Sequence, residues 1–137
     1  MKLLVTGASG FIGTNLVPFY QKQGWEVLNL DIATPLDNEQ KAVWKSVDIM
    51  DRDALFQECS DFAPTHGLHM AARTDCVEGV DLHKEYDVNI NGTRNVLDAI
   101  QQTPGIRRVI ITSSQYVCGP EHFPQDMNDY GPHTVYG

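Results

Sequence analysis

A short glycine-containing stretch near the start of the chain constrains the fold more than any other feature. This stretch, residues 5–13, reads Val-Thr-Gly-Ala-Ser-Gly-Phe-Ile-Gly and lies between an apolar run and an amphipathic run. This order predicts a strand, a tight turn and the start of a helix. A helix start offers unpaired backbone N–H groups and a partial positive charge, so it can hold a phosphate group. An ordinary strand–turn–helix unit without a ligand is the alternative.

Each glycine of this stretch has a distinct predicted role. Gly7 lets the chain turn sharply, Gly10 lets a pyrophosphate approach the backbone, and Gly13 lets the helix pack closely on its strand. Phe11 and Ile12 open the predicted helix and belong to the same expected phosphate site. The stretch therefore predicts a dinucleotide site at the carboxyl end of the first strand.

The remainder of the chain alternates short apolar runs with helical patterns, which is typical of βαβ units and of an α/β fold with a parallel sheet. The expected strands are residues 2–6, 26–31, 43–47, 66–71 and 108–112, and the expected helices are residues 11–23, 51–59 and 82–103. Pro18 lies inside the first helix, where it removes a backbone hydrogen bond, so we expect a kink or a break there. Asp51 is expected to cap the second helix. Loops are expected at residues 32–42, at residues 73–81 and after Ser113.

Size and charge exclude several classes of protein. The 137 residues suit one domain, and the net charge of −8 argues against a nucleic-acid partner or an anionic membrane surface. No apolar run reaches the length of about 18 residues that a membrane span needs, and the chain begins with a predicted strand instead of a signal peptide. The odd number of widely spaced cysteines, 3 in all, favours reduced thiols and a cytoplasmic location.

Asp31 ends the second predicted strand, the one that follows the glycine stretch and its helix. A carboxylate there can accept hydrogen bonds from both ribose hydroxyls of an adenosine, and it would repel a 2′-phosphate. No Arg or Lys lies at positions 8, 9, 32 or 33 to attract that phosphate. With Ile32 beside it, Asp31 therefore favours NAD over NADP, although an acidic loop residue without a ligand is the alternative.

Other candidate cofactor residues follow the third strand or lie on the long helix. Asp48 could contact the adenine amino group while Ile49 packs on the ring; a helix-capping or solvated acid is the alternative. Asn and Gly are poor residues for a helix interior. We therefore expect Gly92 to allow close approach to the sheet and Asn89 to bridge the loop after the fourth strand to the cofactor. A plain surface Asn is the alternative.

The end of the fourth predicted strand carries small side chains. Together with Met70, the small residues Ala71 and Ala72 would let a cofactor backbone pass close above the sheet. Close helix packing is an alternative that is compatible with this role. The nearby His66 and His69 are three residues apart on a strand, so they point to opposite faces and do not form a metal site.

Hydroxyl side chains leave the fifth predicted strand at Thr112, Ser113 and Ser114, and Tyr136 follows later in the chain. Side chains at the carboxyl ends of parallel strands face the crevice where ligands bind, and Thr112 is assigned to the cofactor there. A Ser and a Tyr beside a nicotinamide can interconvert an alcohol and a ketone, because a phenolate takes the hydroxyl proton while the serine orients the oxygen. An ordinary phenol has a pKa of about 10, so this chemistry needs a nearby positive charge such as an ammonium group.

Taken together, these stretches resemble the NAD-dependent epimerase/dehydratase family, the extended short-chain dehydrogenases that act on nucleotide sugars. The resemblance is carried by TGASGFIG at 6–13, Asp31, HMAA at 69–72, NINGT at 89–93, SSQYVCG at 113–119 and VYG at 135–137. It implies an incomplete Rossmann-type doubly wound sheet with strand order 3-2-1-4-5, NAD as cofactor and a nucleotide-sugar substrate. It also makes Tyr136 the catalytic general acid/base and Ser114 the catalytic hydroxyl.

The chain departs from the family pattern at several places. The family's tyrosine opens a Tyr-x-x-x-Lys motif, whose lysine would lie beyond Gly137, so we expect this chain alone to be nearly inactive. Gln115 and Tyr116 stand where the family's dehydratases carry Asp and Glu, which favours an epimerase or a plain dehydrogenase or reductase. Cys118 replaces a usual Tyr, which we expect to affect packing only. A non-catalytic dinucleotide sensor or scaffold and an NADPH-dependent reductase are the alternatives.

The fifth strand is expected to leave an exposed edge. In the family, further strands and helices follow it, and without them the strand has an unpaired edge and uncovered apolar surface. Burial of apolar surface is worth about 25 cal/mol per Å². We therefore expect the chain to associate with itself through this surface or to exchange elements with a neighbouring copy.

Overall fold

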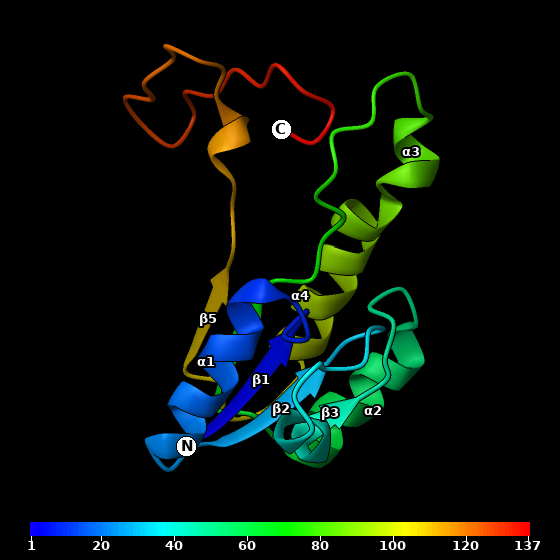
Figure 1. Ribbon diagram of the computed structural model, residues 1–137, viewed down its shortest axis with the longest axis vertical. Helices are drawn as coiled ribbons and strands as arrows, with labels where there is room; N and C mark the ends of the chain where they lie inside the picture. The colour runs from blue at the N-terminus through cyan, green and yellow to red at the C-terminus, as the bar shows by residue number, and fades with distance from the viewer.

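The structure, a computed structural model, describes all residues from Met1 to Gly137. Five parallel strands form one sheet in the order β3-β2-β1-β4-β5 (Figure 1). The strands are β1 (Lys2–Thr6), β2 (Glu26–Leu30), β3 (Trp44–Lys45), β4 (His66–His69) and β5 (Arg108–Ile111). The α/β class and the strand order expected from the sequence are confirmed. All strands except β1 end earlier than expected. β3 has only two residues, and both pair with the end of β2.

Helices cover both faces of the sheet. They are α1 (Phe11–Lys22), α2 (Arg52–Phe62), α3 (Leu82–Glu85) and α4 (Thr93–Gln101), with short turns η1 (Glu39–Val43), η2 (Val88–Gly92) and η3 (Gln115–Val117). The α2 helix begins after Asp51, whose carboxylate accepts a hydrogen bond from the N–H of Ala54 at 3.1 Å, so the predicted cap is confirmed. The α2 helix extends past the predicted end at Cys59.

The central strand β1 is buried on both sides, because successive side chains of a strand point to opposite faces. Leu3 and Val5 pack with Val17 of α1 on one face. Leu4 packs with Leu55 of α2 and with apolar residues of α4 on the other face. The sheet therefore has two apolar cores, and its carboxyl edge is left free for polar groups.

Of the kink or break expected at Pro18, the break is wrong, since α1 runs without interruption from Phe11 to Lys22. The missing N–H of Pro18 would have donated to the carbonyl oxygen of Thr14, four residues earlier. The side-chain amide of Gln40 donates to that oxygen instead, at 2.7 Å, and Gln40 is only 3% exposed. The η1 turn, which overlaps the end of the loop expected over residues 32–42 and continues to Val43, brings Gln40 to this position.

The long helix expected over residues 82–103 is interrupted between α3 and α4 by the π-helical turn η2. The side-chain amide of Asn89 accepts a hydrogen bond from the N–H of Arg73 at 2.7 Å and donates to the carbonyl oxygen of Arg73 at 2.9 Å. This ties η2 to the loop after β4. A Cβ on Gly92 would lie 2.7 Å from the side chain of Ile49, so Gly92 allows close approach to the loop after β3 and not, as expected, to the sheet.

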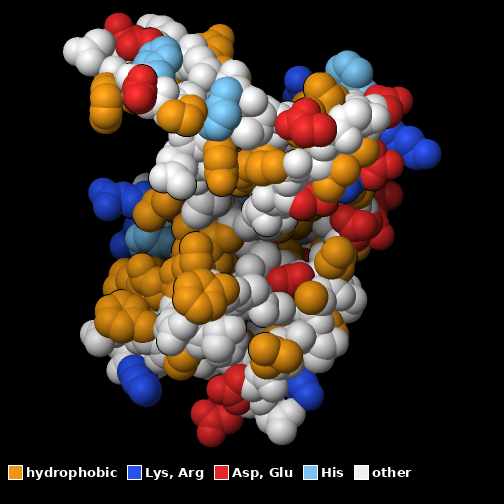
Figure 2. Space-filling view, turned by 45° about the horizontal axis from the view of Figure 1, so that its top comes forward, with side chains coloured by type: hydrophobic (Ala, Val, Ile, Leu, Met, Phe, Trp, Pro, Cys, Tyr) orange, Lys and Arg blue, Asp and Glu red, His pale blue; other side chains and the backbone are white.

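Two segments extend beyond the carboxyl edge of the sheet: the loop that leads into α3, and the segment after β5, which carries η3 (Figure 1). Hydrophobic side chains gather on one face of the molecule (Figure 2). Large apolar side chains that are exposed include Phe11, Phe19, Ile110, Ile111, Phe123 and Met127. None of the helices combines the length and the apolar character that crossing a membrane would require.

Candidate functional site

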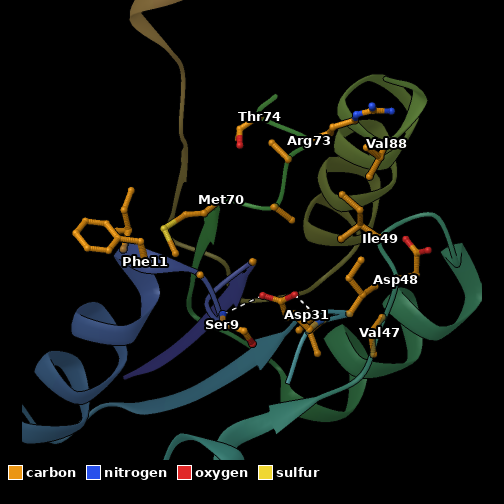
Figure 3. A pocket seen from close by; sticks show the side chains of 18 residues that line it. Ser9, Phe11, Asp31, Val47, Asp48, Ile49, Met70, Arg73, Thr74 and Val88 are labelled. Carbon is orange, nitrogen blue, oxygen red and sulfur yellow. Dashed lines mark hydrogen bonds between the residues drawn. The ribbon is translucent and has the colours of Figure 1, made fainter. Parts of the chain in front are cut away.

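A cleft of about 650 Å³ lies over the carboxyl ends of the strands (Figure 3). Its walls come from the glycine turn, the end of β2, the loop after β3 and the loop after β4. Predicted cofactor residues that line it are Gly7, Gly10, Phe11, Ile12, Asp31, Ile32, Asp48, Ile49, Met70, Ala71 and Ala72. The fold therefore brings together residues from four separate segments of the sequence.

The glycine turn lies tightly against the end of β4. Gly7 has a φ of +78°, and a Cβ added to it would lie 2.6 Å from the backbone nitrogen of Ala71. Both the backbone conformation and the space available therefore require glycine at this position. The predicted sharp turn is present, and it closes the side of the cleft next to Ala71.

The start of α1 presents an uncapped helix N-terminus to the cleft. Gly10 is the N-cap residue, no side chain caps the helix, and the first turn contains no acidic residue. The backbone N–H groups of a first helical turn lack helical acceptors and carry a partial positive charge. Because Gly10, Phe11 and Ile12 line the cleft, this end of the helix suits the pyrophosphate of a dinucleotide.

Asp31 lies across from this helix start, directly after β2 (Figure 3). One carboxylate oxygen accepts a hydrogen bond from the N–H of Ser9 and the other from the N–H of Ala33, each at 2.9 Å. These bonds fix the carboxylate at the cleft wall and leave each oxygen with a further lone pair. The group can therefore accept hydrogen bonds from ribose hydroxyls without losing its own support.

Asn29, a buried polar residue of β2, also shapes the glycine turn. Its side-chain oxygen accepts a hydrogen bond from the N–H of Ala8 at 3.0 Å, and its amide donates to the hydroxyl of Ser9 at 3.1 Å. Sequence reasoning missed this residue. The available signal was a polar side chain between two leucines, Leu28 and Leu30, because such a group must find a partner when buried.

Arg73 is the only Lys or Arg that lines the cleft, and sequence reasoning missed it as well. Its guanidinium donates to both carboxylate oxygens of Asp75, at 2.7 and 3.0 Å, and also to the carboxylate of Glu85. The bonds to Asp75 and Glu85 raise the pKa of Arg73, and Arg73 lowers the pKa of Asp75. The cleft thus offers no unpaired cation to an additional phosphate.

Asp48 and Ile49 close the cleft on the side of the loop after β3. The carboxylate of Asp48 accepts a hydrogen bond from the N–H of Met50 at 2.9 Å, so it stabilises a local turn as well as lining the cleft. Ile49 is 4% exposed and packs into the core. Ile49 thus forms an apolar wall beside Asp48, and contact of either residue with an adenine stays a prediction.

A second, smaller cleft of about 190 Å³ adjoins the first and shares Ala71 and Ala72 with it. Both predicted catalytic residues, Ser114 and Tyr136, line this second cleft. The hydroxyl oxygen of Ser114 accepts a hydrogen bond from the N–H of Tyr116 at 3.1 Å, and the ring of Tyr136 packs edge-on against that of Tyr116. No Lys or Arg lines the second cleft.

Three predicted cofactor residues lie outside the larger cleft. Gly13 is buried behind the glycine turn, where a Cβ would lie 2.1 Å from the carbonyl oxygen of Ala8, so its close packing is on the turn and not on the strand. Asn89 and Thr112 line the second cleft. The hydroxyl of Thr112 donates to the carbonyl oxygen of His69 at 3.0 Å. Contact of these residues with a cofactor stays a prediction.

Comparison with known proteins agrees with this geometry. The sequence profile of the NAD dependent epimerase/dehydratase family matches residues 3–137. The N-acetyl-alpha-D-glucosaminyl-diphospho-ditrans,octacis-undecaprenol 4-epimerase of Escherichia coli O157:H7 is 34% identical over 140 residues, which cover 98% of this chain and 39% of that protein. The 3-beta-hydroxysteroid dehydrogenase of Mycolicibacterium neoaurum is 33% identical over 122 residues, which cover 85% of this chain and 32% of that protein.

A solved structure gives the same result for the fold. The UDP-glucose 4-epimerase of Thermus thermophilus, in complex with NAD, matches with a TM-score of 0.81 at 30% identity over 99% of this chain and 46% of that chain. The chain therefore spans less than half the length of each of these proteins. On the profile match, the sequence identity and the fold, the chain belongs to the NAD-dependent epimerase/dehydratase family.

Proposed function

We propose that this chain is the NAD-binding part of a nucleotide-sugar epimerase or oxidoreductase. The observation that supports this most strongly is the position of Asp31, which is fixed at the wall of a cleft that holds no unpaired cation. A carboxylate at this position can accept hydrogen bonds from the ribose hydroxyls of NAD, and it repels the 2′-phosphate of NADP. The family's own description, NAD dependent, supports the same cofactor.

The larger cleft would hold the parts of NAD on different walls. The start of α1, at Gly10 and Phe11, would bind the pyrophosphate, and Asp31 would bind the adenosine ribose. The apolar wall at Ile32 and Ile49 would face the adenine. When bound, NAD supplies the acceptor for a hydride from the alcohol carbon of the substrate.

The second cleft would supply the groups that move and hold the proton. Tyr136 would take the proton of the substrate hydroxyl, and Ser114 would donate a hydrogen bond to the same oxygen. A phenol needs a nearby cation for this role at neutral pH, and the second cleft has no Lys or Arg in its wall. We therefore propose that the 137-residue chain alone has little or no turnover.

A nucleotide sugar is the proposed substrate class. The two 4-epimerases described above are named for sugars joined to a diphosphate. Gln115 and Tyr116, where the family's dehydratases carry an acid pair, support epimerisation or plain oxidoreduction over loss of water. The likeness to a 3-beta-hydroxysteroid dehydrogenase supports a second candidate, an oxidoreductase of a non-sugar alcohol.

Calorimetric titration of the chain with NAD and with NADP tests the cofactor assignment. The expected result is measurable binding of NAD and binding of NADP that is weaker by at least about tenfold, since the phosphate would meet Asp31. Equal or tighter binding of NADP would favour an NADPH-dependent reductase. The absence of binding by both would overturn the proposal.

A non-catalytic sensor would bind NAD equally well, so it needs a separate test. Appearance of NADH after mixing NAD and a nucleotide sugar with a longer form of the protein, one that carries a cation beside Tyr136, would support the enzyme. We also propose a cytoplasmic location, because Cys59, Cys76 and Cys118 are free thiols, which persist in reducing compartments.

A further inference from the structure

His69, the last residue of β4, joins three other segments of the molecule. Its side chain is almost fully buried, with 3% of the residue exposed. Its Nδ1 lies 2.6 Å from the hydroxyl oxygen of Thr6 in β1, and its Nε2 lies 2.9 Å from the hydroxyl oxygen of Thr93 in α4. Its carbonyl oxygen accepts hydrogen bonds from both the N–H and the hydroxyl of Thr112, each at 3.0 Å.

Each partner of His69 is next to a part of the site. Thr6 directly precedes Gly7 and so ends the strand that carries the glycine turn. Thr93 directly follows η2, the turn that carries Asn89. Thr112 leads into the segment that carries Ser114. His69 and Thr93 themselves line the second cleft. The larger cleft and the second cleft are therefore connected, at their shared wall, through one imidazole ring and its backbone.

We propose that His69 is a positioning residue, which sets the spacing between the wall that would hold the dinucleotide and the wall that carries Ser114 and Tyr136. This inference rests on the proposed function, because it treats the two clefts as parts of one site. Transfer between a cofactor and a substrate requires reacting atoms about 3–3.5 Å apart, so small shifts of one wall matter. A buried ring with both nitrogens bonded holds such spacing better than a flexible surface contact.

The surroundings of His69 suit a neutral ring. The ring nitrogens are bonded only to the hydroxyls of Thr6 in β1 and Thr93 in α4, and neither nitrogen is bonded to a carboxylate or a cation. Burial lowers its pKa, so the neutral form is favoured further. A neutral imidazole donates with one nitrogen and accepts with the other, and a hydroxyl can take either role. Both bonds can therefore form at the same time.

The test compares two ligands, NAD and adenosine 5′-monophosphate, by calorimetric titration. The monophosphate would occupy only the part of the cleft near Asp31 and the glycine turn, whereas NAD extends toward the second cleft. His69→Asn places an amide near the original Nδ1 and gives up the bond to Thr93. Thr93→Val removes the same bond, between His69 and Thr93, by replacing the hydroxyl of Thr93 with a methyl group of similar size. Both variants are expected to bind NAD about tenfold more weakly, or about 1.4 kcal/mol, and to bind the monophosphate like the wild type.

Two comparisons distinguish positioning from a general loss of stability. His66→Asn changes the other histidine of β4, which packs on the opposite face against Trp25, and it is expected to leave both affinities unchanged. The double variant of His69→Asn and Thr93→Val is expected to be no weaker for NAD than either single variant, because both changes remove one bond.

The outcomes separate this inference from the proposed function. If the wild type binds neither ligand, the proposed function fails and this inference fails with it. If the wild type binds both ligands, equal weakening for NAD and the monophosphate, or no weakening of either in folded variants, overturns the role of His69 alone. Melting temperatures show which variants are folded, and Thr93→Val keeps the test decisive if His69→Asn does not fold.

Discussion

The carboxylate of Asp31 and the backbone N–H of Ser9 are joined by a hydrogen bond of 2.9 Å, which connects the end of β2 to the glycine turn. The two segments are 22 positions apart in the sequence, yet they form adjacent walls of one cleft. Asp31 therefore acts twice: it stabilises the turn, and it presents a negative charge where a ribose would lie.

Replacement of Asp31 by Asn tests both roles of this residue. The amide keeps one acceptor oxygen but loses the charge, so NAD affinity is expected to fall by about tenfold or more, which is the range for hydrogen bonds to charged groups. The preference for NAD over NADP is expected to narrow, because the repulsion of the 2′-phosphate is removed. Titration calorimetry with both cofactors measures the two effects.

Asp37→Asn is the matched control for this change. Asp37 is also a loop aspartate that accepts a backbone hydrogen bond, from the N–H of Glu39, but it does not line the cleft. Its replacement is expected to leave the affinities for NAD and NADP unchanged. An unaltered cofactor preference in Asp31→Asn would show that the carboxylate does not determine the choice.

Two glycines of the turn are predicted to respond differently to the same change. In Gly13→Ala the new methyl group would lie 2.1 Å from the carbonyl oxygen of Ala8, so the helix must move away from the turn. We expect the free energy of unfolding to fall by about 1–3 kcal/mol. In Gly10→Ala the nearest atom, the carbonyl oxygen of Gly7, is 3.6 Å away, so the fold is expected to remain intact. NAD affinity is expected to fall, because Gly10 lines the cleft where the pyrophosphate is expected and a methyl group would take up space there. Urea denaturation and cofactor titration together measure this contrast, and equal stability losses in the two variants would contradict it.

Much of the architecture could be predicted from local sequence patterns. Apolar runs and glycines report on the chain within a few residues of themselves, so they indicated the strands, the turn and the position of Asp31 after β2. The residue types at the carboxyl ends of the strands then indicated one cleft, because parallel strands bring those ends together. These features could be predicted because the same neighbouring residues that form the sequence pattern also determine the local structure.

The features that were missed depend on contacts between distant segments. The interruption of the long helix follows from the bonds of Asn89 to the backbone of Arg73. The pairing of Arg73 with Glu85 removes a cation from the cleft, and no spacing rule predicts that pairing. The helix around Pro18 stays continuous, and the Gln40 amide reaches it from another loop to bond the carbonyl oxygen that Pro18 leaves without a helical donor. Tertiary contacts outweighed local propensity at each of these places.

The bond between Gln40 and the carbonyl oxygen of Thr14 gives a prediction about stability. In Gln40→Ala this oxygen loses its partner, so we expect the free energy of unfolding to fall by about 1–3 kcal/mol. Adding Pro18→Ala restores a helical N–H that can donate to the same oxygen. The double variant is therefore expected to recover part of the loss, and urea denaturation of the four proteins in this cycle measures the coupling. Strictly additive effects would show that Pro18 and Gln40 do not share this acceptor.

Stability is predicted to fall on both sides of neutral pH for two identifiable reasons. Burial lowers the pKa of His69 below its usual value near 6.5, so the unfolded chain binds a proton that the folded chain does not, and stability falls as the pH drops through about 6.5. Burial raises the pKa of the Cys59 thiol to about 11 from 9.0, so the unfolded chain loses its proton first. Stability therefore also falls as the pH rises above about 9.

Single variants test which residue causes the fall of stability with pH on the acid side and which on the alkaline side. His69→Asn is expected to reduce the acid slope above about pH 5, where the carboxylates are still ionised. Cys59→Ala is expected to reduce the alkaline slope, with a lower overall stability because a cavity is created. Melting temperatures across the pH range provide the measurement, and slopes that survive both changes would mean that other groups cause them.

The exposed edge of β5 predicts self-association. β5 pairs only with β4, and its residues Ile110 and Ile111 are 53% and 46% exposed. A compact monomer of 15.3 kDa is expected to expose about 7,100 Å², whereas this chain exposes 8572 Å². The excess is larger than the roughly 800 Å² that each partner buries in a standard protein interface. A second copy that covers this edge would remove both the free strand edge and the apolar surface.

Light scattering after size-exclusion chromatography, over a range of concentrations, measures this association. The wild type is expected to shift toward dimers or larger species as the concentration rises. Ile110→Lys places a charge on the edge, so it is expected to shift the protein toward the monomer. Leu36→Lys is the control, because Leu36 is 90% exposed on the loop after β2 and lies on a different part of the chain. A wild type that stays monomeric at high concentration would contradict the predicted association. If Leu36→Lys shifts the protein toward the monomer as much as Ile110→Lys does, the association depends on net charge and not on the edge of β5.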